Sequence, residues 1–143
     1  METLVQYIHN GISLLYLLAS AYVIVLSYLR WKSGAAWQKS LYYWSLIVLI
    51  TMYLQLAQGV YLFLAQRYFN TGAALDKPSD LRFWPVEHFF LMLFALLTAQ
   101  LGVVIVVNSK KPQTQHKLLL GYFTISLIMV LVSLAMILDF SQH

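Results

Sequence analysis

LRFWPVEHFFLMLFALLTAQLG, residues 81–102, is a hydrophobic segment that carries a glutamate and a histidine side by side near its start, Glu87 and His88. Ionisable side chains are costly inside a bilayer, and where they occur they usually face other helices and mark a functional site. Glu87 lies about 100° around the helix from His88, so we expect it to cap the helix start or to meet Arg82. His88 is therefore the first candidate functional residue.

The composition of the chain is that of an integral membrane protein. Hydrophobic residues make up 61% and charged residues 10% of the 143 residues, and the mean hydropathy is +0.72. Soluble domains are about half apolar and about a quarter charged. Four apolar segments, approximately 8–29, 41–66, 85–107 and 118–139, are each long enough to cross a bilayer. We predict an all-α fold, an antiparallel bundle of four transmembrane helices that forms one domain over residues 1–143.

The distribution of basic residues predicts the orientation of the bundle. Residues 30–39 and 108–117 carry three basic residues each and no acid, whereas residues 67–82 mix both signs. Basic residues accumulate in cytoplasmic loops, so both termini should face outward, which in a bacterial inner membrane means the periplasm. The same rule accounts for the net charge of +4, and nothing indicates a nucleic-acid partner; the expected surroundings are membrane lipids.

Two histidines stand at matched depth on different helices. The chain has no cysteine, which excludes iron–sulfur ligation and covalent haem attachment, so a cofactor would be held by His, Met, Tyr or carboxylate. With span centres near Leu18 and Leu96, His9 lies about 13 Å and His88 about 12 Å outward of the midplane at 1.5 Å per residue. We therefore predict that His9 and His88 share one metal site.

The neighbours of these histidines are predicted from helical spacing. Tyr16 falls on the same face as His9, and Met92 falls on the same face as His88, so both are expected to line the site. The glutamines and serines are expected to make interhelical hydrogen bonds. The last span, 118–139, offers few polar residues and is expected to serve as packing. His116 and His143 are expected to be solvated, in a loop and at the C-terminus.

Several motifs together resemble a known group of proteins. They are His9, Gln55-x-x-x-Gly59, Arg82-Phe-x-x-Val-Glu-His-x-x-x-Met92 and His116-Lys117, and they extend over nearly the whole chain. In this pattern the chain resembles small four-helix bacterial membrane proteins, common in Bacteroidota, that are usually labelled cytochrome b-like. Many of these relatives have a histidine two residues before the helix-two glutamine, where this chain has Tyr53.

The resemblance implies a noncovalently bound haem b. Such a haem is commonly held in a membrane bundle by one histidine from each of two helices, here His9 and His88. Arg67 and Arg82, together with Lys77, would then neutralise the propionates. The protein would act as an electron carrier or subunit rather than a stand-alone enzyme. Its partners would be a quinol, an outer-side redox protein or a larger respiratory complex.

Two other classes of function remain open at this point. An accessory or structural subunit of a larger membrane complex would need no cofactor. A quinone-binding protein would use His88, Gln58 and Tyr16 as hydrogen-bonding groups without a metal. A hydrolase is disfavoured because no nucleophile–base motif or phosphate-binding loop occurs, and an unbroken set of four short spans disfavours a transporter.

The orientation can be tested by cysteine labelling, since the chain has no cysteine of its own. In intact cells, Ser33→Cys should not react with a membrane-impermeant thiol reagent applied from the periplasmic side. A matched variant in the outward loop, Thr71→Cys, should react. Labelling of Ser33→Cys but not Thr71→Cys would show the opposite orientation.

Overall fold

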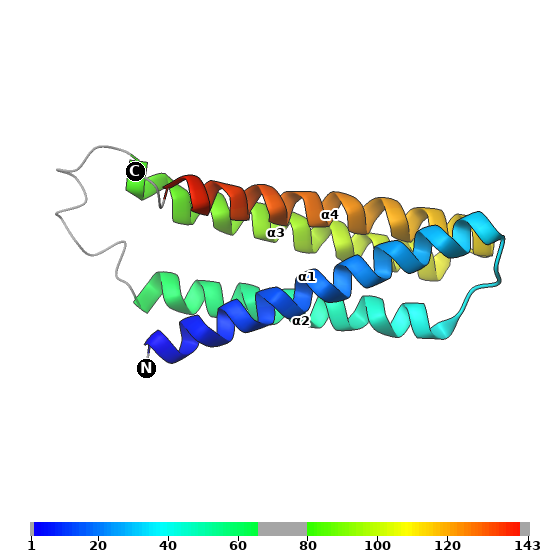
Figure 1. Ribbon diagram of the computed structural model, residues 1–143, viewed down its shortest axis with the longest axis horizontal. Helices are drawn as coiled ribbons and strands as arrows, with labels where there is room; N and C mark the ends of the chain where they lie inside the picture. Colours follow the sequence, from blue (N-terminus) through cyan, green and yellow to red (C-terminus); the bar gives the residue numbers. More distant parts are fainter. Residues whose placement is uncertain (1, 66–79, 141–143) are drawn as a thin grey trace.

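The computed structural model describes the backbone of residues 2–65 and 80–140, and side chains mainly within 4–64 and 86–136. It consists of four antiparallel α-helices packed as a bundle, as Figure 1 shows. This confirms the predicted fold class. The helices are α1 (Glu2–Ser33), α2 (Lys39–Ala65), α3 (Asp80–Asn108) and α4 (Pro112–Phe140).

Each helix meets two neighbours around the bundle. α1 packs against α2 and α4, and α3 packs against the same two helices, most extensively against α4. α1 and α3 therefore lie diagonally opposite one another. Side chains that point to the bundle axis from these two helices approach across the centre rather than along a shared seam.

Two short connections lie together at one end of the bundle, which we call the loop end (residues 34–38 and 109–111; Figure 1). α1 stops there in a Schellman motif: Gly34 has φ of 68°, its N–H donates to the Trp31 carbonyl at 3.4 Å, and the Ala35 N–H donates to the Arg30 carbonyl at 3.1 Å. α4 begins with Pro112 in its first turn, where a missing N–H costs nothing.

The exposed surface of the bundle is apolar. The candidate membrane spans are Tyr7–Ser33, Lys39–Leu62, Val86–Asn108 and Pro112–Met136, and only about a third of each is buried inside the protein. The remainder exposes leucine, isoleucine, valine and aromatic side chains around the bundle. A surface this apolar is suited to lipid rather than to water. The four helices therefore indicate an integral membrane protein.

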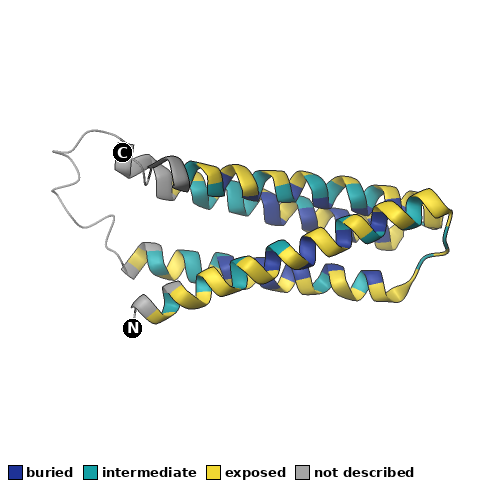
Figure 2. Ribbon diagram, viewed as in Figure 1, coloured by how far each residue is buried: buried dark blue, intermediate teal, exposed yellow. Residues whose placement is uncertain are grey.

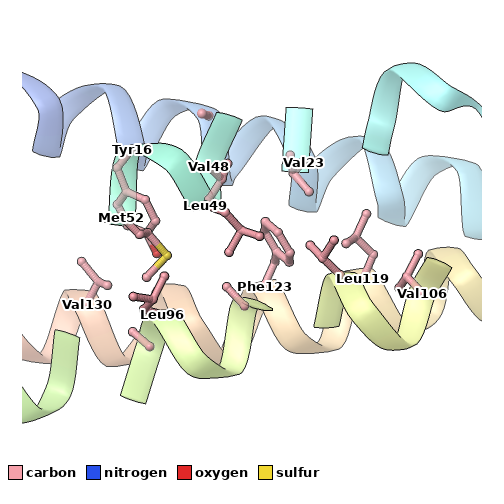
Figure 3. Close-up of a cluster of buried hydrophobic side chains, with 14 of the residues drawn as sticks. Tyr16, Val23, Val48, Leu49, Met52, Leu96, Val106, Leu119, Phe123 and Val130 are labelled. Atoms are coloured by element: carbon pink, nitrogen blue, oxygen red, sulfur yellow. The ribbon is translucent and has the colours of Figure 1, made fainter. Parts of the chain in front are cut away.

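The tightly packed core occupies the loop end and the middle of the bundle. Figure 3 shows its interdigitated side chains, among them Met52, Leu96 and Phe123, and Figure 2 shows where the buried positions lie. Among the described side chains, the last buried positions toward the other end are Tyr16, Gln55, Ala95 and Ser133. We call the region beyond these four residues the histidine end.

The described side chains become less buried toward the histidine end. In Figure 1, α1 crosses the bundle obliquely, whereas α2 and the α3–α4 pair run roughly along its length. The described side chains at the histidine end are half-buried or exposed, and none is fully buried. The bundle is thus close-packed in the middle and at the loop end and less completely buried at the histidine end.

Among the described glycines, Gly102 marks the closest approach between two helices, α3 and α4. A Cβ atom built on Gly102 would lie 2.5 Å from the Cβ of Tyr122, far inside van der Waals contact. Only glycine allows this separation, as small residues do in packed transmembrane helices. Because α3 and α4 share the most extensive interface, Gly102 fixes the spacing of the larger helix pair.

We expect Gly102→Ala to destabilise the bundle by about 1–3 kcal/mol, the usual cost of overpacking a core. Gly121→Ala is the matched control in α4, because a Cβ there would meet nothing within 4 Å. Unfolding of both variants in mixed detergent micelles measures the difference. Equal stability of the two variants would contradict the close approach of α3 and α4.

Candidate functional site

His9 lies on α1 in a small hydrogen-bonded group with α2. The Ser13 hydroxyl donates to the His9 carbonyl at 2.9 Å, and the Gln55 amide donates to the same carbonyl at 2.6 Å and to the Ser13 hydroxyl at 2.9 Å. These bonds join the backbone of α1 to α2. The His9 ring takes no part in these bonds. Its Nδ1 is buried and has no hydrogen-bond partner among the described residues.

His88 lies on α3 and is held by α4. Its Nδ1 shares a hydrogen bond of 2.5 Å with the hydroxyl of Ser133, which is 1% exposed. This bond fixes the rotation of the imidazole about its side-chain axis. His88 and His9 therefore both lie at the histidine end, on diagonally opposite helices.

The register of the helices explains why the two histidines share one level. Tyr16 lies beside Ser126, and the Ser126 hydroxyl donates to the Ala95 carbonyl at 2.8 Å, so these residues of α1, α4 and α3 share one level. His9, Ser133 and His88 each stand seven residues from the members of that level. Seven residues are two helical turns, or about 10 Å along the axis, so the second set forms a parallel level nearer the membrane surface.

Two amide oxygens add to the polar groups at this end. The Gln55 and Gln58 side-chain oxygens are buried and find no donor within the described part of the chain. A buried polar group without a partner costs about 1–3 kcal/mol. With the His9 nitrogen, three such atoms therefore lie along α1 and α2 where the core thins out, and all three are suited to bind a donor or an electrophile.

The other predicted site residues are distributed around these groups. Tyr16 is 2% exposed and belongs to the core just inside the histidine level. Met92 is half-buried and packs against the same core. Glu87 is exposed. The side chains of Arg67, Lys77 and Arg82 lie outside the described residues, so their predicted contact with propionates stays a prediction.

The described carboxylates and histidines do not gather into a larger cluster. In the parts of the chain whose side chains are described, no group of three or more His, Asp or Glu residues could hold a metal ion. The donor set at the histidine end is thus two imidazoles. Such a pair suits a planar metal cofactor with its own equatorial ligands better than it suits a bare ion.

Tyr53 points away from this site. Its side chain is 47% exposed, and its hydroxyl donates to the Gln100 side-chain oxygen on α3. The position at which many proteins of the resembling group have a histidine therefore lies on the outer seam between α2 and α3. In this chain that seam is closed by a tyrosine–glutamine hydrogen bond.

The expectation that His116 is a solvated loop residue is wrong. α4 begins at Pro112, so His116 is helical, and its side chain is fully buried with its ring 5.3 Å from that of Trp37. The His116 ring lies beside the backbone of Ala35 and Ala36, in the connection between α1 and α2. The polar sequence around His116 concealed this, because a helix can continue beyond the apolar segment that marks a span.

The expectation that the last span serves only as packing was also incomplete. Ser133 orients His88, and Ser126 binds the backbone of α3. Their seven-residue spacing, which also separates Ser13 from Ser20 and Ser20 from Ser27, was the available signal. It places a row of hydroxyls along one face of each helix.

Comparisons with known proteins identify no relative of this chain: no family model, no curated protein and no solved structure matches it. The chain is a small four-helix membrane protein whose site must be interpreted from its own residues.

We expect Ser133→Ala to lower stability by about 1 kcal/mol, the typical worth of one hydrogen bond, because it removes the bond to His88. Ser27→Ala is the control, since the Ser27 hydroxyl is fully buried without a hydrogen-bond partner in the described chain and its loss should be neutral or slightly stabilising. Detergent unfolding of both variants checks this. If Ser27→Ala cost as much as Ser133→Ala, the hydrogen bond would not be what Ser133 contributes.

Proposed function

We propose that this protein binds one haem b between His9 and His88 and carries electrons within the membrane. The observation that carries the proposal is the placement of these two histidines at one level on diagonally opposite helices. A haem held by two histidines would need them on facing helices with space between them. None of the described side chains at the histidine end is fully buried, which is consistent with such a ligand.

The residues present fit a bis-histidine group. Ligating histidines commonly bind a second residue through their other ring nitrogen, which fixes their tautomer and orientation. Ser133 is in position to do this for His88. The His9 Nδ1 is buried and lacks a hydrogen-bond partner among the described residues. A bound ligand would explain why this ring is buried.

Each residue would have a distinct part. When bound, haem b supplies an iron that gains and loses one electron, and its potential depends on its axial ligands and its burial. Tyr16 and Met92 would form the apolar floor that separates the group from the core. Arg67 and Arg82 would meet the propionates at the membrane surface. Gln55 would hold α1 in position through the His9 carbonyl.

The proposed location is a bacterial inner membrane with the histidine end toward the periplasm, as the distribution of basic residues predicts. A single haem near that face would exchange electrons with a quinol or with a redox protein on the outer side. A larger respiratory complex would provide the same partners. The middle and loop end of the bundle, which are packed with apolar side chains, would serve as its anchor.

A quinone site is the second candidate, favoured by one specific observation. The side-chain oxygens of Gln55 and Gln58 are buried acceptors with no donor among the described residues, and the hydroxyls of a quinol would satisfy them. His88 and Tyr16 would then be hydrogen-bonding groups. An accessory subunit without any cofactor is the third candidate, since interhelical hydrogen bonds account for part of the polar residues.

Optical spectroscopy distinguishes these candidates. Purified from its native membrane, the protein should give the reduced-minus-oxidised spectrum of a low-spin b-type haem. His88→Ala should abolish that spectrum, and His9→Ala should abolish it or convert it to a high-spin form. His116→Ala, at the opposite end, should leave it intact.

Two results would contradict the proposal. A colourless preparation from cells that make haem would favour the accessory subunit or the quinone site. A spectrum that survives in the double variant His9→Ala, His88→Ala would show that other residues bind the haem.

A further inference from the structure

A groove separate from the histidines lies at the loop end, between the last turn of α1 and the first half of α4. It has a volume of about 530 Å³ and opens to the outside of the bundle. Its lining divides by chemistry along its length. Trp31, Gln113, Thr114 and Lys117 form the part nearest the loops, and Leu118, Gly121, Tyr122 and Ile125 form the part toward the membrane interior.

The dimensions of the groove match one leaflet of a bilayer. From residue 113 to residue 125 of α4 the axial distance is about 18 Å at 1.5 Å per residue. Half of the hydrocarbon core is about 15 Å thick. Gly121 contributes to the hollow, because a Cβ atom there would meet nothing within 4 Å. A chain that entered beside Lys117 would therefore follow the groove for about 12 Å, most of the way to the midplane.

The charge at the loop end is of one sign. Residues 30–39 and 108–117 carry six basic residues and no acid. Lys117 lines the groove itself, and the Lys32 ammonium lies 5.2 Å from the ring centre of Trp31, another lining residue. A choline or ethanolamine headgroup would bring a cation to lysines with no carboxylate to balance it. A headgroup with a net negative charge would be attracted.

We propose that this groove binds one anionic phospholipid, with its phosphate at Lys117 and Gln113 and one acyl chain along Gly121 and Ile125. Basic sites between transmembrane helices commonly hold anionic headgroups. A free phosphate ion would use only the polar part of the groove and leave the apolar part without a ligand. The proposal does not depend on the haem at the other end of the bundle.

Quenching of tryptophan fluorescence by brominated lipids tests this site. The full-length protein is placed in phosphatidylcholine vesicles in which a minor fraction of lipid is dibrominated phosphatidylglycerol or, in parallel, dibrominated phosphatidylcholine. One lysine near a headgroup is worth about a fivefold preference. Dibrominated phosphatidylglycerol should therefore quench as if it bound about fivefold more tightly than dibrominated phosphatidylcholine. Trp31→Phe should remove this difference in quenching between the two lipids.

Matched variants separate the groove from the general surface charge. Lys117→Gln should bring the two lipids close to parity, while Lys110→Gln, an exposed lysine outside the groove lining, should keep the preference. Gly121→Leu should fill the groove and reduce the preferential quenching by phosphatidylglycerol.

Parity in the unaltered protein, an equal loss in Lys110→Gln and Lys117→Gln, or selective quenching that persists in Trp31→Phe or Gly121→Leu would each overturn the proposal. Relief of quenching by inorganic phosphate would show a free-anion site instead. Relief by a long-chain quinone, but not by unbrominated phosphatidylglycerol, would show a quinone site.

Discussion

The structure depends on hydrogen bonds that cross between helices inside an apolar bundle. In a membrane the hydrophobic effect does not hold helices against one another, so packing and polar contacts decide how they sit. The Ser126–Ala95 bond sets the register of α4 on α3, and the Gln55–His9 bond sets that of α2 on α1. The close approach at Gly102 then sets the spacing of the larger pair.

This register brings ionisable and amide groups to the two ends and leaves mainly apolar side chains with a few hydroxyls between them. At the histidine end, the His9 Nδ1 and the side-chain oxygens of Gln55 and Gln58 are buried without partners in the described chain. At the loop end a Schellman turn and an all-basic surface surround a groove open to lipid. The two ends thus have different chemistry, one suited to a buried cofactor and the other to a lipid headgroup.

Much of the architecture was predictable because helical rise and periodicity are local properties. Span length and apolar composition predict four helices, and counting residues puts His9 and His88 at one depth. What the sequence did not reveal depends on how helices rotate against each other. Ser133 is an ordinary serine until α4 turns it toward His88, and His116 looks like a loop residue until the helix that begins at Pro112 buries it against Trp37.

The account rests centrally on His9 and His88 acting on one bound group. Pulsed electron paramagnetic resonance of the oxidised protein, produced with ¹⁵N-labelled histidine, tests this most directly. The account predicts one low-spin ferric centre coupled to nitrogens from two histidines, and in His9→Ala either no bound centre or a high-spin centre coupled to one histidine. A centre coupled to a single histidine in the unaltered protein, or to two histidines that both persist in His9→Ala, would contradict it.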